Sequence, residues 1–447
     1  MGKTSSVSER AQQAFRRFMQ VDGFDVVIDL KNSSRLWIRD ARSGRQYLDF
    51  FSFVTSNPLG MNPAAFQEPE FREKLFYAAC HKVSNSDIAT PELMDFVETF
   101  SRIARPDFMA HLFFIEGGTQ GVENSLKAAF DWKVRKNFAA GSREEKGQQV
   151  IHFRQAFHGR SGYCLSITNT IDPAKTQYFP KFNWPRIDNP KILFPLNGEN
   201  LAEVERAESE SIRQMEGAFA GNPGDIAAII IEPIQGEGGD NHFRPEFFQS
   251  LRRLADEQEA MLILDEVQTG LGMTGKMWAY EHTGIRPDMI AFGKKAQVCG
   301  FMCSARVDQV ARNVFAVPSR INSTWGGNLA DMVRSQRILE TIEKENLVEN
   351  AARMGAYLHD SLCSLQCDYP VLIRNCRGRG LMQAFDFPDP DFRRRFLEDI
   401  GERGLLILPC GSCSVRFRPP LIVDSSEIDT AMGMVRQSLR TVSGGRS

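Results

Sequence analysis

Short runs of apolar residues recur along the chain and alternate with longer stretches of helical periodicity. Two of these runs, 261–264 and 289–292, are wholly apolar and are followed at once by polar residues. Continuous apolar runs of this length are typical of strands that are buried on both faces of a parallel sheet. Asp265 follows the first run, and Lys294 and Lys295 follow the second after one glycine. Because the carboxyl ends of parallel strands open onto one crevice, we expect the carboxylate and a lysine to lie close together.

The same alternation of strand and helix extends over most of the chain and favours an α/β fold with a mostly parallel sheet. Further strands are expected at 112–115, 150–153 and 227–231, and helices at 92–104, 122–138, 197–217, 245–260 and 329–345. The alternating residues between 36 and 50 predict a hairpin, and residues 9–20 a short amphipathic helix. After about residue 330, shorter runs at 373–381 and 415–420 predict a second, smaller α+β domain.

A glycine-rich segment, Gly117-Gly118-Thr119-Gln120-Gly121, lies between the expected strand 112–115 and the helix 122–138. In this position it presents backbone N–H groups and the positive end of a helix dipole to an anion. The segment lacks the Gly-Lys-Ser/Thr of a Walker loop and the spacing of the dinucleotide fingerprint, which argues against a nucleotide-binding Rossmann protein. It therefore predicts a site for a phosphate or a carboxylate.

The pairing of Asp265 with a lysine at neighbouring strand ends suits pyridoxal phosphate. A lysine can form the Schiff base, and a carboxylate can keep the pyridine nitrogen protonated so that the ring withdraws electrons. An alternative interpretation of the spacing alone is a helix-capping aspartate beside two solvated lysines. The other segments of the chain decide between these interpretations.

Composition limits the class of protein further. The 54 basic and 56 acidic side chains among 447 residues nearly cancel, so there is no basic surface for nucleic acid. No apolar run approaches the ~20 residues of a membrane helix. The nine cysteines favour a reducing, cytoplasmic location, and Cys410 and Cys413 are expected to be free thiols because no second pair completes a zinc site. No metal centre is predicted.

Several segments, in this order, resemble the class III, pyridoxal phosphate-dependent aminotransferases over about residues 25–440. They are Phe157-His158-Gly159-Arg160, the run 231–238 (Ile-Glu-Pro-Ile-Gln-Gly-Glu-Gly), the run 264–270 (Leu-Asp-Glu-Val-Gln-Thr-Gly), Lys294, and the run 324–328 (Thr-Trp-Gly-Gly-Asn). The segments 22–25, 47–51, 84–87, 129–133 and 293–300 are similar to the branch of that family that acts on the terminal amine of lysine.

The resemblance implies a fold-type I transferase in which a large domain carries the cofactor. The expected organisation is an N-terminal segment (1–60) that joins the small domain, a large domain (61–328) and a C-terminal small domain (329–447). The resemblance also implies a homodimer with shared active sites, because a residue of one subunit would reach the phosphate of its neighbour.

The resemblance assigns the cofactor contacts residue by residue. Lys294 is the expected Schiff-base lysine, with Lys295 as its competitor, and Asp265 is expected to pair with the pyridinium. The remaining cofactor-binding residues are Gly118 and Thr119 at the phosphate, Phe157 on the ring face, His158, Gln268 at the ring hydroxyl, and Thr324 reaching the phosphate of a neighbouring subunit. The family usually has Ser-Gly-Thr where this chain has Gly117-Gly118-Thr119, so one hydroxyl is lost.

Two arginines and a glutamate are expected to select the substrates. Arg160 would hold the distant carboxylate of a substrate and Arg416 the carboxylate next to the reacting carbon, since guanidinium groups pair with carboxylates in bidentate fashion. Glu237 would neutralise Arg416 while a terminal amine occupies the site and then swing away. The other expected substrate contacts are Val54 and Asn322.

The reaction implied by the resemblance moves the terminal (epsilon) amino group of L-lysine to 2-oxoglutarate, giving 2-aminoadipate 6-semialdehyde and L-glutamate. Within the family, 4-aminobutyrate and ornithine 5-aminotransferases are the alternatives. A catalytically silent protein that binds pyridoxal phosphate on the same fold is a further alternative from a different class.

Overall fold

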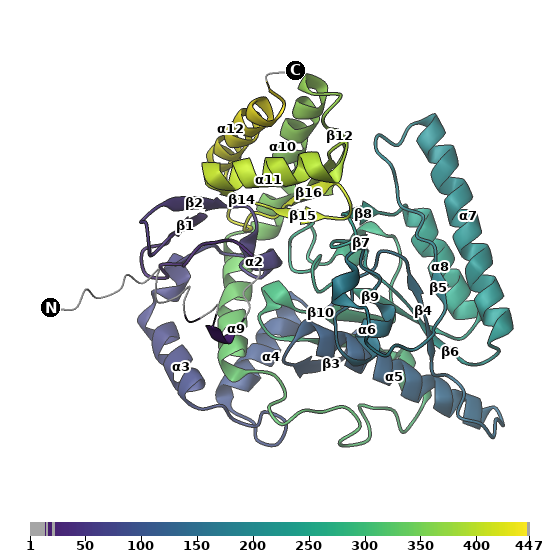
Figure 1. Cartoon of the computed structure of the whole chain (residues 1–447). Helices are drawn as coiled ribbons and strands as arrows, with labels where there is room; N and C mark the ends of the chain where they lie inside the picture. Colours follow the sequence, from purple (N-terminus) through teal and green to yellow (C-terminus); the bar gives the residue numbers. More distant parts are fainter. Residues whose placement is uncertain (1–13, 15–16, 20–22, 445–447) are drawn as a thin grey trace.

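A seven-stranded sheet forms the centre of the molecule (Figure 1). The structure is a computed structural model that describes residue 14, residues 17–19 and residues 23–444, so the helix expected at 9–20 falls mostly outside the described residues. Across the sheet the strands are ordered β3-β11-β10-β9-β6-β4-β5. Their bounds are β3 (Met109–Ile115), β4 (Gln149–Phe153), β5 (Arg186–Ile187), β6 (Ile226–Ile231), β9 (Met261–Asp265), β10 (Met289–Phe292) and β11 (Cys299–Ser304).

The sheet is mostly parallel, which confirms the prediction. Only β11 runs antiparallel to its neighbours β3 and β10 among these seven strands. Every residue of β6, β9 and β10 is buried, which accounts for their continuous apolar sequences. The sequence analysis missed β11, whose Gly300 has no room for a side chain because a Cβ there would lie 1.9 Å from the carbonyl oxygen of Phe113.

Helices cover both faces of this sheet. Alternate residues of β9 point to opposite sides, as a strand requires: Ile263 packs with the cluster that contains Trp132 of α5, and Leu262 packs with the cluster that contains Phe247 of α8. Four helices predicted for this part are present within a few residues of the expected bounds: α4 (Pro91–Ile103), α5 (Gly118–Ala139), α7 (Gly198–Gly221) and α8 (Pro245–Glu257). The sequence analysis did not predict α3 (Pro69–Cys80) and α6 (Gly162–Ile167).

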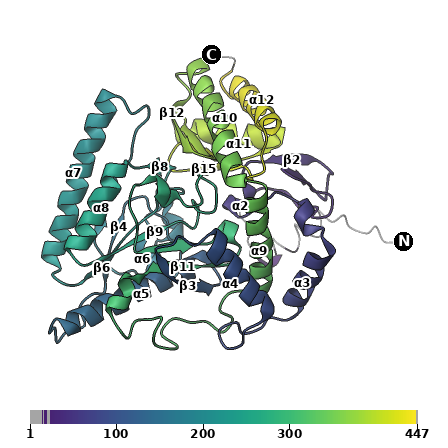
Figure 2. The same ribbon diagram turned by 180° about the vertical axis from the view of Figure 1, so that it is seen from behind.

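A second group of elements lies above the large sheet in the view of Figure 1 and is seen from behind in Figure 2. An antiparallel sheet with the order β12-β13-β16-β15 packs against three helices. The elements are α10 (Leu347–Asp368), β12 (Arg374–Arg379), β13 (Met382–Asp386), α11 (Pro390–Arg403), β15 (Leu408–Cys410), β16 (Ser414–Phe417) and α12 (Ser425–Val442). This α+β arrangement agrees with the prediction for the C-terminal part.

The N-terminal hairpin lies with the C-terminal elements although it is far from them in sequence. Strand β2 (Gln46–Asp49) pairs antiparallel with β1 (Trp37–Arg39) and parallel with β14 (Leu405–Leu406). The helix α9 (Leu329–Lys344) links the two parts of the molecule, since Met332 belongs to the core around α4 and Ile342 to the core around α10. The remaining short elements are α2 (Ser52–Thr55), β7 (Ile234–Gln235), β8 (Asn241–His242) and the 3-10 turns η1 (Ala64–Phe66), η2 (Pro173–Lys175), η3 (Ala279–His282), η4 (Lys294–Ala296) and η5 (Ala305–Gln309).

The short turn α2 has an unusual backbone. Four successive residues from Ser52 to Thr55, none of them glycine, have φ between 43° and 69°, in the left-handed region. Such a conformation costs roughly 1–2 kcal/mol per residue and persists only where neighbouring groups hold it. The carboxylate of Asp49 provides one anchor, because its Oδ1 accepts hydrogen bonds from the N–H groups of Phe51 and Ser52 at 2.9 and 2.6 Å. None of the helices in the described part of the chain is long and apolar enough to cross a membrane.

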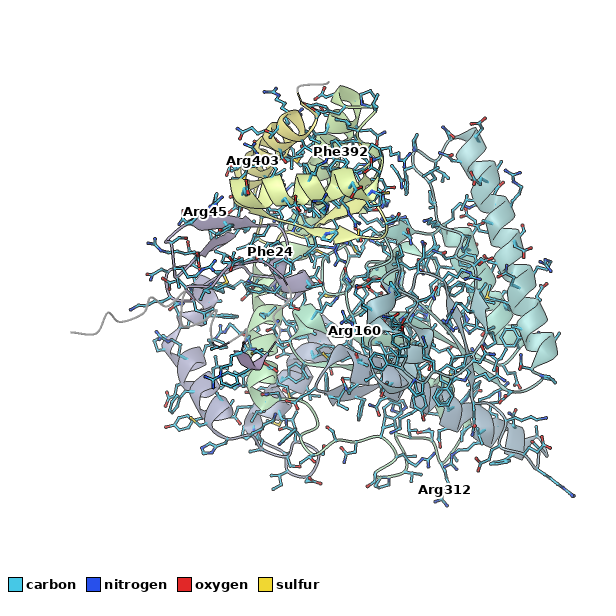
Figure 3. All side chains as sticks on the ribbon, viewed as in Figure 1. Phe24, Arg45, Arg160, Arg312, Phe392 and Arg403 are labelled. Atoms are coloured by element: carbon cyan, nitrogen blue, oxygen red, sulfur yellow. The ribbon has the colours of Figure 1, made fainter. Side chains whose placement is uncertain are left out.

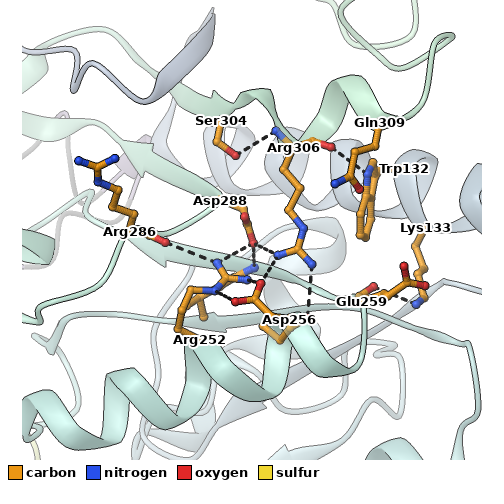
Figure 4. Close-up of polar contacts among 12 residues, drawn as sticks. Trp132, Lys133, Arg252, Asp256, Glu259, Arg286, Asp288, Ser304, Arg306 and Gln309 are labelled. Carbon is orange, nitrogen blue, oxygen red and sulfur yellow. Dashed lines mark hydrogen bonds and ion pairs between the residues drawn. The ribbon is translucent and has the colours of Figure 1, made fainter.

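A buried carboxylate ties the amino-terminal edge of the large sheet to the outer helices (Figure 4). Oδ2 of Asp288 accepts hydrogen bonds from the N–H of Leu262 at 2.7 Å and from Nη1 of Arg252 and Arg306 at 2.9 and 3.1 Å. The same arginines also reach Asp256, whose side chain is 57% exposed. Asp288 is therefore the buried member of this network and Asp256 the exposed one.

We expect Asp288→Ala to lower the melting temperature by about 5 °C, because it removes the buried carboxylate from two guanidinium groups and leaves a buried N–H without its partner. The matched variant Asp256→Ala removes an exposed carboxylate from the same arginines and should change the melting temperature by less than about 2 °C. Thermal unfolding followed by circular dichroism measures both shifts. Equal shifts would show that burial of Asp288 contributes nothing to its effect.

Candidate active site

A cavity of about 470 Å³ opens at the carboxyl ends of five parallel strands, β3, β4, β6, β9 and β10. It is lined by Ser56, Gly117, Gly118, Thr119, Phe157, His158, Gly159, Glu232, Asp265, Val267, Gln268, Lys294, Gln297 and Cys299. Two larger hollows, of about 680 and 630 Å³, lie elsewhere and contain neither the glycine segment nor a strand-end carboxylate. The 470 Å³ cavity is where strand ends, a helix N-terminus and ionisable groups meet, which is the usual place for a ligand in such a sheet.

Of the two adjacent lysines, only Lys294 lines the cavity. Burial and the positive charge of Arg416 lower the pKa of Lys294 to about 8, although the negative charge of Asp265 acts in the opposite direction. Lys295 points elsewhere and is 2% exposed, with its Nζ donating hydrogen bonds to the carbonyl oxygens of Gln268 and Thr55 at 2.8 and 3.5 Å. The geometry thus favours Lys294 over its competitor as the reactive amine.

Asp265, the last residue of β9, lies in the cavity wall and is 5% exposed. Its Oδ2 is 2.7 Å from Nδ1 of His158, and its Oδ1 accepts a hydrogen bond from the N–H of Val267 at 3.1 Å. Both carboxylate oxygens are therefore fixed by neighbours. The sequence analysis placed His158 among the cofactor contacts, and the structure gives it a specific partner in Asp265.

Glu232 also lines the cavity, although the sequence analysis gave it no role. Its carboxylate accepts hydrogen bonds from the N–H groups of Phe157 and Gly236 at 2.9 and 3.0 Å. Burial raises the pKa of Glu232 to about 7. The charge of His158 partly opposes this rise, and the charge of Asp265 adds to it. Glu232 fixes the turn that carries Phe157, and the only sequence signal for it was its place directly after the β6 strand.

The long helix α5 begins in the glycine segment, where the backbone has a conformation that only glycine adopts readily. Gly117 has φ +92°, and a Cβ there would lie 2.4 Å from the side chain of Gln120. A serine in place of Gly117 would meet both this contact and the strained φ. On the opposite wall, Gly159 has φ +128° and a Cβ there would lie 2.3 Å from Oγ1 of Thr119. The glycines therefore leave the helix N-terminus open to an anion.

The two arginines that the sequence singled out have different surroundings. Arg416 on β16 is 7% exposed, and its Nη1 donates a hydrogen bond to Oε1 of Gln268 at 3.3 Å. Its Nε has no hydrogen-bond partner among the described residues. Arg160, labelled near the middle of the molecule in Figure 3, is exposed and lies over the ring of Phe157, 5.8 Å from the centroid. Arg416 is thus a buried cation and Arg160 an accessible one.

Glu237 lies on the turn between β7 and β8 and makes no ion pair with Arg416 among the described residues. Its Oε1 instead accepts hydrogen bonds from Nζ of Lys175 at 2.6 Å and from Oγ1 of Thr170 at 2.7 Å. In the sequence-based prediction Glu237 alternates between Arg416 and a position away from it. This arrangement corresponds to the second of these positions, and the pairing with Arg416 stays a prediction.

Six predicted contacts lie outside the lining of this cavity: the three charged residues just described, Arg160, Glu237 and Arg416, and also Val54, Asn322 and Thr324. The carbonyl oxygen of Thr324 accepts a hydrogen bond from Oγ of Ser84 at 2.6 Å. Thr324 was predicted to act on a neighbouring subunit, so its place outside the cavity of its own chain leaves that prediction untested. The roles of Val54 and Asn322 likewise stay predictions.

Comparison with known proteins identifies the family to which the chain belongs. Residues 18–439 match the family described as Aminotransferase class-III. The chain belongs to the class-III aminotransferases. It is 52% identical to an L-lysine-epsilon aminotransferase of Mycobacterium tuberculosis over 435 residues, 97% of this chain and 96% of the relative. A 4-aminobutyrate aminotransferase of Kluyveromyces lactis is 31% identical, covering 92% of this chain and 90% of the relative.

A solved structure of the lysine aminotransferase from M. tuberculosis resembles this fold closely. It superposes with a TM-score of 0.95 at 52% identity and covers 97% of this chain and 99% of that one. The protein is therefore a pyridoxal phosphate-dependent aminotransferase with the fold-type I architecture that the sequence analysis expected.

The residues of the cavity fit pyridoxal phosphate. The glycine cradle, in which a Cβ at residue 117 or 159 would collide with neighbours, leaves space for a phosphate at the start of α5. We infer that Lys294 holds the cofactor covalently, that Asp265 faces its ring nitrogen and that Phe157 covers the ring. When bound, the cofactor withdraws electrons from the carbon that bears the substrate amine. Asp265 would supply the fixed negative charge for this effect, and its contact with His158 would set its orientation.

The lowered pKa of Lys294 predicts how apoenzyme binds its cofactor at different pH. A lysine with an unshifted pKa near 10.4 is almost wholly protonated at neutral pH, whereas an amine with pKa about 8 is half neutral at pH 8. Covalent capture of pyridoxal phosphate needs the neutral amine, so its rate should rise with pH and level off above a midpoint near 8. Stopped-flow absorbance measures this profile. A midpoint above 10 would contradict the lowered pKa.

Proposed function

We propose that this protein is an L-lysine 6-transaminase that moves the terminal amino group of L-lysine to 2-oxoglutarate, with 2-aminoadipate 6-semialdehyde and L-glutamate as products. The proposal is carried by one observation, the buried Arg416 beside the cavity with an unpartnered Nε. A buried guanidinium without an anion is costly, so a substrate carboxylate is its natural partner. The similarity to lysine-epsilon aminotransferases supports lysine as the amine donor.

The positions of the two arginines explain how one cavity serves two different substrates. A molecule of 2-oxoglutarate has carboxylates at both ends, and these would pair with Arg160 and Arg416 in bidentate fashion. Lysine has only one carboxylate, which would pair with the exposed Arg160 and leave the terminal amine at Lys294. Arg416 would then lack a partner, and Glu237 would supply one by moving to it. The orientation of lysine thus follows from which arginine its carboxylate occupies.

An amine-donor panel with 2-oxoglutarate tests the proposal against its alternatives. We expect L-lysine to give the highest kcat/KM, above 4-aminobutyrate and L-ornithine. The product semialdehyde cyclises and can be trapped with an aromatic aminoaldehyde reagent, which identifies the nitrogen that was lost. A product that retains the terminal amine and carries a 2-keto group would overturn the orientation argument. A complete lack of turnover with every amine would favour a silent protein that only binds the cofactor.

Removing Glu237 should shift the preference between substrates. With Glu237→Ala, Arg416 has no protein carboxylate to pair with during the lysine half-reaction, so a substrate carboxylate is favoured there. We expect the ratio of kcat/KM for glutamate to that for lysine to rise about tenfold or more, since leaving a buried charge unpaired costs at least ~1.4 kcal/mol. Half-reactions followed by absorbance of the bound cofactor give both values. An unchanged ratio would exclude the proposed role of Glu237.

We also infer that the protein works as a homodimer. Thr324 and Asn322 lie outside the cavity of their own chain, and apolar side chains nearby are exposed, with Ile88 67% and Trp325 40% exposed. A second copy of the chain would cover these side chains and bring Thr324 to the neighbouring cavity. Light scattering of the eluting holoenzyme measures the mass, and a value near 50.4 kDa would contradict the dimer.

The division into domains is a further proposal. We infer a large domain of residues 61–328, which carries the sheet and the cavity, and a small domain of residues 329–447 that is joined by the segment 1–60. The pairing of β2 with β14 and the shared core between them support this division. Helix α9 contributes to both cores, so it would serve as the link between the two domains.

A further inference from the structure

The carboxylate of Glu237 is held away from Arg416 by two side chains that the sequence analysis did not consider. Lys175 Nζ lies 2.6 Å from Oε1 of Glu237, and Thr170 Oγ1 donates a hydrogen bond to the same oxygen at 2.7 Å. The side chains of Lys175 and Glu237 are 25% and 23% exposed. The contact is therefore partly shielded from water, and it is the only ion pair that the structure gives Glu237 within the described part of the chain.

The segment that carries these two side chains is fixed to the wall of the active-site cavity. Thr168 Oγ1 accepts a hydrogen bond from the N–H of His158 at 3.0 Å and donates one to the carbonyl oxygen of Gly159 at 2.6 Å. Asp172 then caps the short turn η2, its side chain accepting a hydrogen bond from the N–H of Ala174 at 3.0 Å. Thr168 thus ties the start of this segment to the cavity wall, and Asp172 caps the turn that ends in Lys175.

We propose that Lys175, assisted by Thr170, is a second docking position for Glu237 and sets how readily Arg416 accepts a substrate carboxylate. This inference rests on the proposed function, in which Arg416 binds the carboxylate of 2-oxoglutarate and Glu237 covers Arg416 when lysine reacts. Lys175 is a positioning residue. It acts through Glu237 and touches neither substrate nor cofactor.

The charges of the three groups explain why a second docking position is useful. One carboxylate is shared between two cations, and Arg416 is buried whereas Lys175 is partly exposed. When Glu237 moves to Arg416, Lys175 keeps contact with water and lies 3.9 Å from a second carboxylate, that of Asp172. When Glu237 returns to Lys175, its own negative charge stays compensated and Arg416 is open to a carboxylate. Neither position leaves Glu237 without a cation.

Replacing the lysine with an apolar side chain of similar length should shift this balance toward Arg416. In Lys175→Met, Glu237 has lost its alternative cation, so it should cover Arg416 more of the time. We expect the KM for 2-oxoglutarate to rise about fivefold, the scale of a partly exposed ion pair, with kcat unchanged. The kcat/KM for lysine should not fall.

Binding of glutarate provides a readout that does not depend on turnover. This five-carbon dicarboxylate lacks a keto group, so it can occupy both arginines without reacting. Its inhibition constant against lysine should weaken about fivefold in Lys175→Met, because the same competition with Glu237 applies. In Lys175→Arg, which keeps a cation at this position, we expect a value within about twofold of wild type.

Two control variants separate this effect from a loosened segment. Lys181→Met removes a lysine six residues further on whose Nζ, within the described residues, donates only to the carbonyl oxygen of Thr176, and it should leave the glutarate constant unchanged. In the Glu237→Ala background, Lys175→Met should have no effect on glutarate, because the competing carboxylate is gone. A loss that persists in that background, or an equal fall in the lysine and 2-oxoglutarate half-reactions, would overturn the role of Lys175.

The outcomes also separate this inference from the proposed function. If wild-type enzyme fails to transfer the terminal amine of lysine, the proposed function is wrong whatever Lys175 does. If wild type transfers it and binds glutarate, but Lys175→Met leaves the glutarate constant unchanged, only the docking position is wrong. A fivefold weakening that disappears in the double variant supports both.

Discussion

Lys294→Ala is expected to lower turnover by at least ~10³-fold, the scale of loss when a nucleophile or general base is removed from an enzyme. Lys294 follows β10 after one glycine, lines the cavity and has a pKa lowered to about 8 by burial and by Arg416. These features supply a neutral amine where the cofactor aldehyde would lie. Steady-state kinetics with lysine and 2-oxoglutarate measures the loss, and added primary amines that restore turnover would support a chemical role over a folding role.

The neighbouring lysine provides the matched control. Lys295→Met keeps an unbranched side chain in the same buried space and removes hydrogen bonds to the carbonyl oxygens of Gln268 and Thr55. We expect it to keep turnover within about tenfold of wild type, at some cost in stability. Borohydride reduction followed by peptide mapping should place the pyridoxyl group on Lys294. A pyridoxyl group on Lys295 would reverse the assignment.

The sequence predicted those elements of the fold whose residue pattern follows from a single physical requirement. The strands β6, β9 and β10 are buried on both faces, so every position must be apolar and the pattern is unambiguous. Strand β11 is buried except at its last residue, but it contains a glycine and ends in a serine, so its apolar run is short and gives a weaker signal. The left-handed turn at 52–55 has no local signal either, because none of its residues is the glycine that such a backbone normally requires, and Val54 and Thr55 are β-branched.

The site residues that follow strand ends could be predicted from the sequence. Contacts between side chains that are far apart in the sequence could not. Asp265 and Lys294 could be found because the carboxyl ends of adjacent parallel strands share one crevice. The contacts of Glu232 with Phe157 and of Lys175 with Glu237 join positions 62 or more residues apart, and nothing in the local pattern reports them. Contacts of this kind depend on the folded chain.

Asp265→Ala is expected to lower kcat by ~10²-fold or more, because a hydrogen-bonded charge pair at a buried site contributes about 3 kcal/mol. Asp265 is 5% exposed at the end of β9, so little water is available to replace its charge beside the pyridine nitrogen. Without that charge the nitrogen would lose its proton, and the ring would withdraw electrons poorly. Single-turnover absorbance of the lysine half-reaction measures the chemical step directly.

The effect of charge can be separated from the effect of shape. Asp265→Asn keeps the size of the side chain and can still accept the hydrogen bond from Val267, but it carries no negative charge. We therefore expect it to be nearly as slow as Asp265→Ala. His158→Gln removes the imidazole that orients the carboxylate through the 2.7 Å contact, and it should cause a smaller loss, about tenfold.

A cofactor analogue methylated on the ring nitrogen gives the deciding comparison. This analogue carries its positive charge permanently, so it does not need Asp265 to keep a proton on the nitrogen. It should therefore raise the rate of Asp265→Ala, where the missing side chain leaves room for the methyl group, and lower the rate of wild type, where the carboxylate and its neighbour His158 fill that space. If the analogue leaves Asp265→Ala as slow as natural cofactor does, the loss comes from a disturbed cavity and Asp265 does not act through the ring nitrogen.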